Sequence, residues 1–233
     1  MIRVKLCGLM SREDVELAVA AGADSLGFVT EYPVPVPWNL TRRQAAELVR
    51  QTPPFVTTTA VVGGPVADML DIARQVRPHF LQLHGDETAA EIRAVCAGLE
   101  DTGTRAIKAL RIDVDSGAAK FEIPDPVGAA TALAGTGIAA LVIDSKTSSR
   151  PAGTGVALDW QLAARIAAAV DLPLILAGGL HPENVTAAVD AVRPYAVDVI
   201  SGVESETGVK DAALARDFVA AARRGAGGQE SLQ

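Results

Sequence analysis

Cys7 and Asp144 are the two residues of this sequence best suited to exchange protons with a small molecule. Each lies at the end of a short apolar segment, 2–7 or 139–144. Lys5 precedes Cys7 by two residues, and a neighbouring cation favours the thiolate that a general base requires. A packing role remains open for Cys7, and a loop-capping role for Asp144.

Two glycine-containing turns have the composition of a phosphate site. Gly178 and Gly179 end one apolar segment. Ser201 and Gly202 end the next. Glycine lets the backbone approach a ligand closely, and the start of a following helix offers unpaired N–H donors. The turns therefore predict a bound phosphate, with tight turns that hold no ligand as the alternative.

Short apolar segments alternate with longer amphipathic segments along the chain. They are rich in Val, Ile and Leu, which is typical of buried parallel strands. Eight strand–helix alternations in 233 residues predict an α/β fold, a single closed (β/α)8 barrel. An open doubly wound sheet is the alternative, but no GxGxxG loop follows the first strand. The expected strands are 2–7, 24–29, 55–62, 79–84, 105–110, 139–144, 173–178 and 197–201.

The amphipathic segments carry helix start signals. Ser11 and Thr41 are expected N-caps, and Gln44 occupies the capping-box position after Thr41. Pro65 and Pro182 predict further helix starts, because the N–H that proline lacks would be unpaired at a first helical position.

Side-chain alternation predicts which strand residues point into the barrel. Lys5 and Cys7 share one face of their strand, and its apolar face has to meet the surrounding helices. The same argument turns Gln82, His84 and Asp144 inward. Such residues converge on the C-terminal mouth, where barrel enzymes hold their active sites. For His84, a hydrogen-bonding wall residue is the expected role and catalysis is the alternative.

Composition limits the compartment and the partners. The net charge of −7 argues against general binding to nucleic acid or anionic membrane. Two cysteines cannot form a disulfide framework and predict a reducing, cytoplasmic location. The three histidines are not at metal-ligand spacing, so no metal site is predicted. We expect a barrel over 1–222, least regular at 111–135, and a flexible tail over 223–233.

Nine segments, taken in order, resemble the phosphoribosylanthranilate isomerase family of tryptophan biosynthesis. The resemblance covers nearly the whole chain, and an ordered set of this length is more specific than any one motif. The segments are VKLCGL (4–9), ADSLGFV (23–29), LQLHGDE (81–87), IKAL (107–110), LVIDSK (141–146), AGTGVALDW (152–160), LILAGGLHPENV (174–185), RPYAVDVISGVE (193–204) and GVKD (208–211).

The resemblance implies an Amadori rearrangement, in which an N-(5-phosphoribosyl)amine opens and becomes a 1-amino-1-deoxyribulose 5-phosphate. It implies that Cys7 is the general base for the C2′ proton and Asp144 the general acid at the ring oxygen. An acid at neutral pH requires a raised Asp144 pKa, which burial can supply. No cofactor is implied.

The resemblance also implies the binding residues. The phosphate would lie on the two glycine-containing turns. Asp198 would contact a sugar hydroxyl, and Lys5 and His84 complete the expected set. The implied partner is a small phosphorylated sugar-amine, bound by a monomer or homodimer, with no nucleic acid and no membrane.

One departure from the family lies in the loop at 30–41. The family carries an arginine there that binds the anthranilate carboxylate, whereas TEYPVPVPWNLT has no basic residue. Arg111 and Arg150 are the candidate replacement cations. The leading function is isomerisation of N-(5-phosphoribosyl)anthranilate. The alternative is a paralogous isomerase for another phosphoribosylated amine, with its ring against Trp38.

An alternative from another class is a phosphate-binding barrel without activity. Cys7 and Asp144 count against it, because a scaffold does not need polar residues at inward strand ends. A sugar-phosphate epimerase or an aldolase is a further alternative, for which Lys5 and Lys108 are the Schiff-base candidates.

Overall fold

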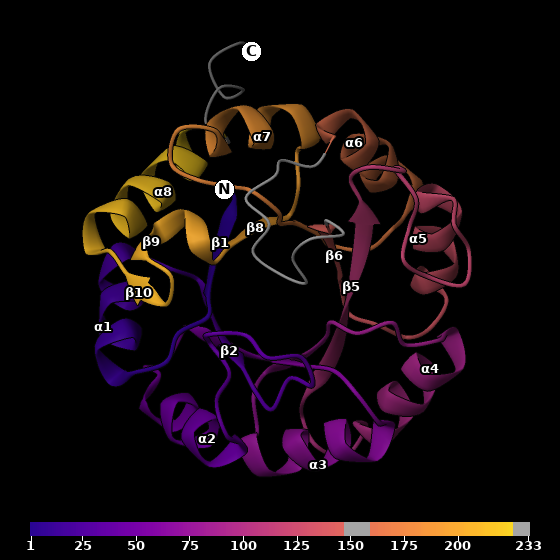
Figure 1. The fold of residues 1–233 in the computed structure, drawn as a ribbon, viewed down its shortest axis with the longest axis horizontal. Helices are drawn as coiled ribbons and strands as arrows, with labels where there is room; N and C mark the ends of the chain where they lie inside the picture. Colours follow the sequence, from indigo (N-terminus) through magenta and orange to yellow (C-terminus); the bar gives the residue numbers. More distant parts are fainter. Residues whose placement is uncertain (147–158, 226–233) are drawn as a thin grey trace.

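Parallel strands close into a barrel that a ring of helices surrounds (Figure 1). The structure is a computed structural model, and it describes residues 1–146 and 159–225. Each barrel strand pairs with the next along the chain, and the eighth pairs with the first. The predicted (β/α)8 barrel is confirmed. Its strands are β1 (Arg3–Cys7), β2 (Ser25–Val29), β3 (Thr57–Val62), β4 (Phe80–Leu83), β5 (Arg105–Asp113), β6 (Leu141–Lys146), β7 (Leu174–Leu176) and β8 (Ala196–Val199).

Helices connect consecutive strands and cover the outside of the barrel. Ser11 and Thr41 cap the first two helices, and the capping box of Thr41 with Gln44 is present as predicted. Pro65 is an N-cap residue rather than the first helical residue. The helices are α1 (Arg12–Ala21), α2 (Arg42–Gln51), α3 (Val66–Val76), α4 (Ala89–Gly98), α5 (Pro126–Ala134), α6 (Trp160–Ala169), α7 (Val185–Val192) and α8 (Ala212–Gly225).

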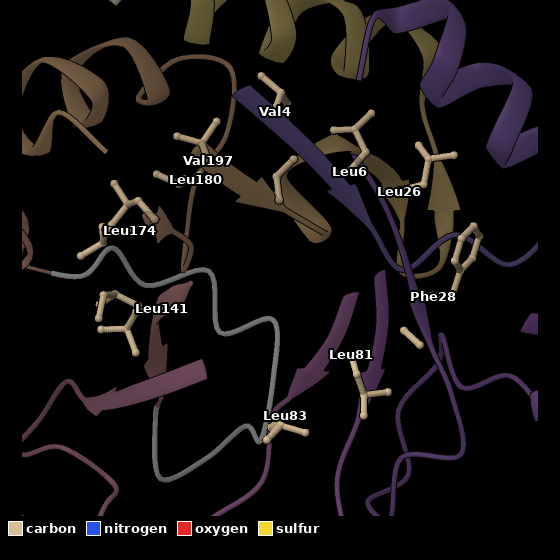
Figure 2. Close-up of a cluster of buried hydrophobic side chains, with 14 of the residues drawn as sticks. Val4, Leu6, Leu26, Phe28, Leu81, Leu83, Leu141, Leu174, Leu180 and Val197 are labelled. Carbon is tan, nitrogen blue, oxygen red and sulfur yellow. The ribbon is translucent and has the colours of Figure 1, made fainter. Parts of the chain in front are cut away.

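The strands separate an outer core from the barrel interior. Val4, Leu6 and Leu141 belong to the large buried cluster that includes the helix faces, and Figure 2 shows them among its side chains. Val142 and Ile107 belong to a separate, smaller cluster. The predicted alternation along β1 and β6 is therefore confirmed, and the polar residues between the outward positions face the interior.

Several element ends differ from the predictions. β3 begins at Thr57 rather than at residue 55, because Phe55 is fully exposed with a φ of 70°, which strand geometry does not allow. α7 begins after Asn184 rather than at Pro182, because the Asn184 side chain accepts a hydrogen bond from the His181 N–H (2.9 Å) and closes a turn there.

The segment after β8 contains a hairpin that the sequence did not predict. A short 3₁₀ helix, η1 (Ser201–Val203), leads into the antiparallel strands β9 (Glu204–Glu206) and β10 (Val209–Lys210). α8 then continues past the expected end of the barrel at residue 222. Residues 226–233 of the expected tail lie outside the described residues. Within the described ranges, none of the helices combines the length and the apolar character that crossing a bilayer requires.

Candidate active site

A pocket opens at the carboxyl ends of the barrel strands. Its volume, including the mouth and the open space in front of it, is about 710 Å³. It is lined by Cys7, Val29, Tyr32, Val36, Trp38, Val61, Gln82, His84, Asp144, Ala177, Gly178, Gly179, Leu180, Asp198, Val199, Ile200, Ser201 and Gly202.

Most of the residues that the sequence nominated meet in this pocket. The strand-end residues Cys7 and Asp144 line it together, although they are far apart in the sequence. Lys5 lies deeper in the barrel, where it is buried in an ion pair. The other nominated residues that line the pocket are His84, Gly178, Gly179, Asp198, Ser201 and Gly202.

Cys7 is almost completely buried at the end of β1. Burial raises the pKa of its thiol, and the positive charge of Lys5 acts in the opposite direction without overcoming it. Lys5 thus favours the thiolate as predicted, but desolvation has the larger effect. In the unliganded protein at neutral pH, the group is therefore a thiol.

Asp144 differs from an ordinary surface aspartate in its proton affinity. Burial, and next the nearby negative charge of Asp198, raises the pKa of Asp144 to about 7. Its Oδ2 lies 3.6 Å from Nε2 of His84. The carboxyl is therefore partly protonated near neutral pH, a state from which it can donate a proton.

Asp198 also points into the pocket, but it has a cationic partner. Its Oδ2 accepts a hydrogen bond of 2.7 Å from Lys5 Nζ, and both side chains are buried. Its Oδ1 is buried and has no hydrogen-bond partner among the described residues. The Oε1 of Gln82 is in the same situation. Both are acceptors without a partner in a pocket wall, and such atoms suit the hydroxyl groups of a sugar.

The glycine-containing turns leave no space for side chains. Gly178 has a φ of 86°, and a Cβ there would lie 2.5 Å from Ser145 Oγ. A Cβ at Gly202 would lie 1.9 Å from the carbonyl oxygen of Leu180. The turns after β7 and β8 therefore pack against each other, and their backbones form one wall of the pocket.

The opposite wall is apolar. Val29 and Val61, at the ends of β2 and β3, form a cluster with Cys7, Tyr32 and Trp38. Sequence reasoning named Cys7 and Trp38 but missed Val29, Val61 and Tyr32. Alternation along β2 and β3 would have turned both valines inward, whereas Tyr32 lies in a loop, where no periodic signal exists.

Arg111 and Arg150 were the candidate cations for a substrate carboxylate. Arg111, in β5, is buried and pairs with Asp86, whose side chain is 67% exposed. Its Nε has no hydrogen-bond partner among the described residues. Arg111 does not itself line the pocket, but its charge acts on the pKa values of both Tyr32 and Asp144. Arg150 lies outside the described residues.

Metal binding has no counterpart in the described part of the chain. There, no three His, Cys, Asp or Glu side chains form a group that could hold a metal ion. The pocket lining contributes the thiol of Cys7, the carboxyl groups of Asp144 and Asp198, and hydrogen-bonding groups.

Comparison with known proteins defines the family. The family model for N-(5'phosphoribosyl)anthranilate (PRA) isomerase matches residues 4–221. The chain belongs to this isomerase family. N-(5'-phosphoribosyl)anthranilate isomerases of Geobacter sulfurreducens and Haloferax volcanii are 42% and 40% identical to it. The alignments cover 96% and 97% of this chain and 99% and 96% of the relatives.

Solved structures of isomerases in the family share the fold. The phosphoribosyl anthranilate isomerase of Thermotoga maritima superposes with a TM-score of 0.80 at 30% identity, over 96% of this chain and all of that one. Another phosphoribosyl anthranilate isomerase, in complex with reduced 1-(o-carboxyphenylamino)-1-deoxyribulose 5-phosphate, has a TM-score of 0.76 at 30% identity over the same shares.

Proposed function

We propose that this protein converts N-(5-phosphoribosyl)anthranilate to 1-(2-carboxyphenylamino)-1-deoxyribulose 5-phosphate by an Amadori rearrangement. One observation carries the proposal: Cys7 and Asp144 line the same pocket as the two glycine-containing turns. This reaction requires a proton donor, a proton acceptor and a backbone surface that can bind a phosphate. The family membership supports the same substrate.

Asp144 starts the reaction as the general acid. Its proton goes to the ring oxygen of the ribose as the C1′–O bond breaks, and the amine nitrogen forms a double bond to C1′. The raised Asp144 pKa, about 7, supports this role, because an ordinary aspartate has no proton to give at neutral pH.

Cys7 acts in the next step of the reaction as the general base. The thiolate removes the C2′ proton, and the electron pair of that bond forms the C1′=C2′ double bond of an enaminol. The enol then becomes the C2′ ketone as C1′ takes up a proton, so atoms and electrons balance without a cofactor. Lys5 supports this role, because its charge lowers the pKa that burial raises.

The sugar phosphate occupies the polar wall. We place the phosphate on the backbone of the turns at Gly178–Gly179 and Ser201–Gly202, since glycine allows close approach there. The free Oδ1 of Asp198 and Oε1 of Gln82 would accept hydrogen bonds from ribose hydroxyls. His84 would orient Asp144 from 3.6 Å.

Arg111 is the described cation that we assign to the substrate carboxylate. Its partner Asp86 is mostly exposed, so it can turn away when a ligand carboxylate takes its place. Arg111→Gln should raise the KM for the anthranilate substrate about tenfold, the value of a charge-assisted hydrogen bond. Asp86→Asn is the matched control, and it should leave the KM unchanged or lower it. An unchanged KM in Arg111→Gln would remove this assignment.

The test of the whole proposal is turnover by the purified full-length chain. N-(5-phosphoribosyl)anthranilate should be consumed with loss of its fluorescence, and Cys7→Ser should lose most of the rate. Turnover of another phosphoribosylated amine alone would favour a paralogous isomerase. Binding of ribose 5-phosphate without turnover of any such amine would favour a non-catalytic barrel.

We infer a cytoplasmic location and a small-molecule partner for this protein. Both cysteines are free, which supports a cytoplasmic location. The partner is the small phosphorylated substrate, bound by a monomer or a homodimer, and size-exclusion chromatography with light scattering decides between these two states.

A further inference from the structure

A chain of buried polar groups connects Trp38 with the turn after β8. The indole Nε1–H of Trp38 donates a hydrogen bond of 2.7 Å to Oε1 of Glu204. Lys210 Nζ donates to the same oxygen at 2.7 Å, and to the carbonyl oxygen of Ile200 at 3.1 Å. The second carboxylate oxygen of Glu204 accepts a bond from the Gly208 N–H at 3.2 Å.

The groups in this hydrogen-bonded network are buried. The side chains of Glu204 and Lys210 are 3% and 1% exposed, and Trp38 is 5% exposed. A buried charge is costly unless it is paired and hydrogen-bonded, and here the carboxylate and the ammonium satisfy each other. The hairpin of β9 and β10 brings the two together, since Glu204 and Lys210 are partners in its register.

This hydrogen-bonded network joins the apolar wall of the pocket to the turn after β8. Trp38 belongs to the apolar wall, and Ile200 packs against that wall and immediately precedes the turn at Ser201–Gly202 on the polar wall. Gly8 lies between Trp38 and Ile200. A Cβ there would be 3.0 Å from both the Trp38 ring and the Ile200 side chain, so the two are packed closely.

The loop that carries Trp38 has its own supports. Asn39 and Tyr32 exchange two hydrogen bonds of 2.9 Å, and Thr30 forms an isolated bridge with Leu40. The loop path therefore does not depend on the indole. The bond to Glu204 orients the ring of Trp38 instead.

We propose that Glu204 and Lys210 are positioning residues that hold Trp38 as a fixed stacking surface for the aromatic ring of the substrate. Through the carbonyl of Ile200, they also keep this surface at a set distance from the phosphate turn. Trp38 is then a specificity-determining residue, since a flat apolar ring selects a planar aromatic amine. The inference rests on the proposed function for the identity of that amine.

The first test measures binding of two probes to the full-length chain. D-ribose 5-phosphate reports on the polar wall alone. Reduced 1-(o-carboxyphenylamino)-1-deoxyribulose 5-phosphate reports on both walls. Trp38→Phe should weaken binding of the second probe about tenfold, because the anchoring N–H is lost, and should leave ribose 5-phosphate binding unchanged. Lys210→Met should weaken binding of both probes, because it also releases the Ile200 carbonyl.

Trp38→Phe removes no charge, so it tests the proposal even if Lys210→Met or Glu204→Gln fails to fold, which thermal melting would show. Equal binding of both probes by wild type and Trp38→Phe would overturn the stacking role. An equal loss for both probes in Trp38→Phe would overturn the division between the walls.

A spectroscopic test follows the ring directly. Trp38 and Trp160 are the two tryptophans of the chain, so Trp160→Phe leaves Trp38 as the sole indole fluorophore. In that background, the aryl probe should change the Trp38 emission and ribose 5-phosphate should not. Glu204→Gln should change the emission of the unliganded protein, because the charged acceptor of the indole N–H is gone. An emission that none of these alters would contradict the proposal.

The outcomes separate this inference from the proposed function. Wild-type protein that binds the aryl probe more tightly than ribose 5-phosphate, yet does not turn over the anthranilate substrate, would remove the isomerase function and keep the stacking surface. Turnover with kcat and KM that are both unchanged in Trp38→Phe would keep the isomerase function and remove the stacking surface.

Discussion

Two carboxylates from neighbouring parts of the barrel line the same pocket with opposite electrostatic surroundings. Asp198, from β8, has the ammonium of Lys5 at 2.7 Å. Asp144, from β6, has His84 at 3.6 Å, and burial and Asp198 raise its pKa to about 7. Asp198 is held in an ion pair, and its negative charge raises the pKa of Asp144.

This contrast shows how two carboxyl groups of one pocket acquire different surroundings. Burial raises the pKa of Asp144, whereas the location of Lys5 gives Asp198 a counter-charge. The pairing of Lys5 also limits what it can do for Cys7, because a carboxylate shares its charge.

The largest effect should come from removing the acid. Asp144→Asn should lower kcat/KM by about 10²–10⁴-fold, the usual contribution of general acid catalysis. Folding should be little affected, because an amide of the same size replaces a carboxyl that is partly protonated near neutral pH. Steady-state kinetics measure kcat/KM, and thermal melting measures the stability of the variant. Unchanged ribose 5-phosphate binding is the control for an intact phosphate site, and a rate within tenfold of wild type would exclude Asp144 as the acid.

Breaking the paired carboxylate should act mainly on stability. Asp198→Asn leaves Lys5 buried without its counter-charge, and we expect a loss of roughly 3–5 kcal/mol in the free energy of unfolding, measured with urea. The double variant Lys5→Met/Asp198→Leu should recover much of this loss, because neither charge then remains buried. If Asp198→Asn is as stable as wild type, the ion pair between Lys5 and Asp198 does not stabilise the fold.

The pH dependence of the rate should show both proton-transfer groups. The proposed mechanism needs Asp144 protonated and Cys7 ionised, although the Asp144 pKa is the lower of the two. Log kcat/KM should therefore rise with pH by about tenfold per unit below pH 7 and level off near 7. It should fall only above the raised pKa of Cys7.

Asp198 sharpens this prediction. Its negative charge raises the Asp144 pKa, so Asp198→Asn should move the lower break in the profile to a lower pH. A break that stays in place, or moves upward, would show that it does not belong to Asp144.

A smaller effect should appear in the pH dependence of stability. The Asp144 pKa is raised in the folded state, so the folded protein binds more protons than the unfolded chain between the ordinary aspartate value of 3.8 and about 7. Stability relative to Asp144→Asn should then fall as pH rises through this range, by at most about 1.4 kcal/mol per unit. Parallel urea titrations of both proteins at several pH values measure it, and a difference that grows with pH would have the wrong sign.

Local patterns in the sequence predict much of the fold. Apolar segments of strand length, their alternation with amphipathic helices, and caps such as Ser11 and Thr41 predicted the barrel, because burial and capping act over a few residues. The hairpin of β9 and β10 escaped this reasoning. Its strands are too short for a periodic signal, and the Glu204–Lys210 pair that stabilises it shows no pattern in the sequence.

For the site, residue types and their spacing were enough to identify the available groups and to place them at inward strand ends. Alternation along their strands predicted that Cys7, His84 and Asp144 lie at one mouth of the barrel. The three-dimensional fold sets the pKa values of Cys7 and Asp144, since these depend on burial and on charges from distant strands, such as that of Asp198. It also decided that Trp38 meets Glu204, a contact across 166 residues that closure of the barrel alone creates.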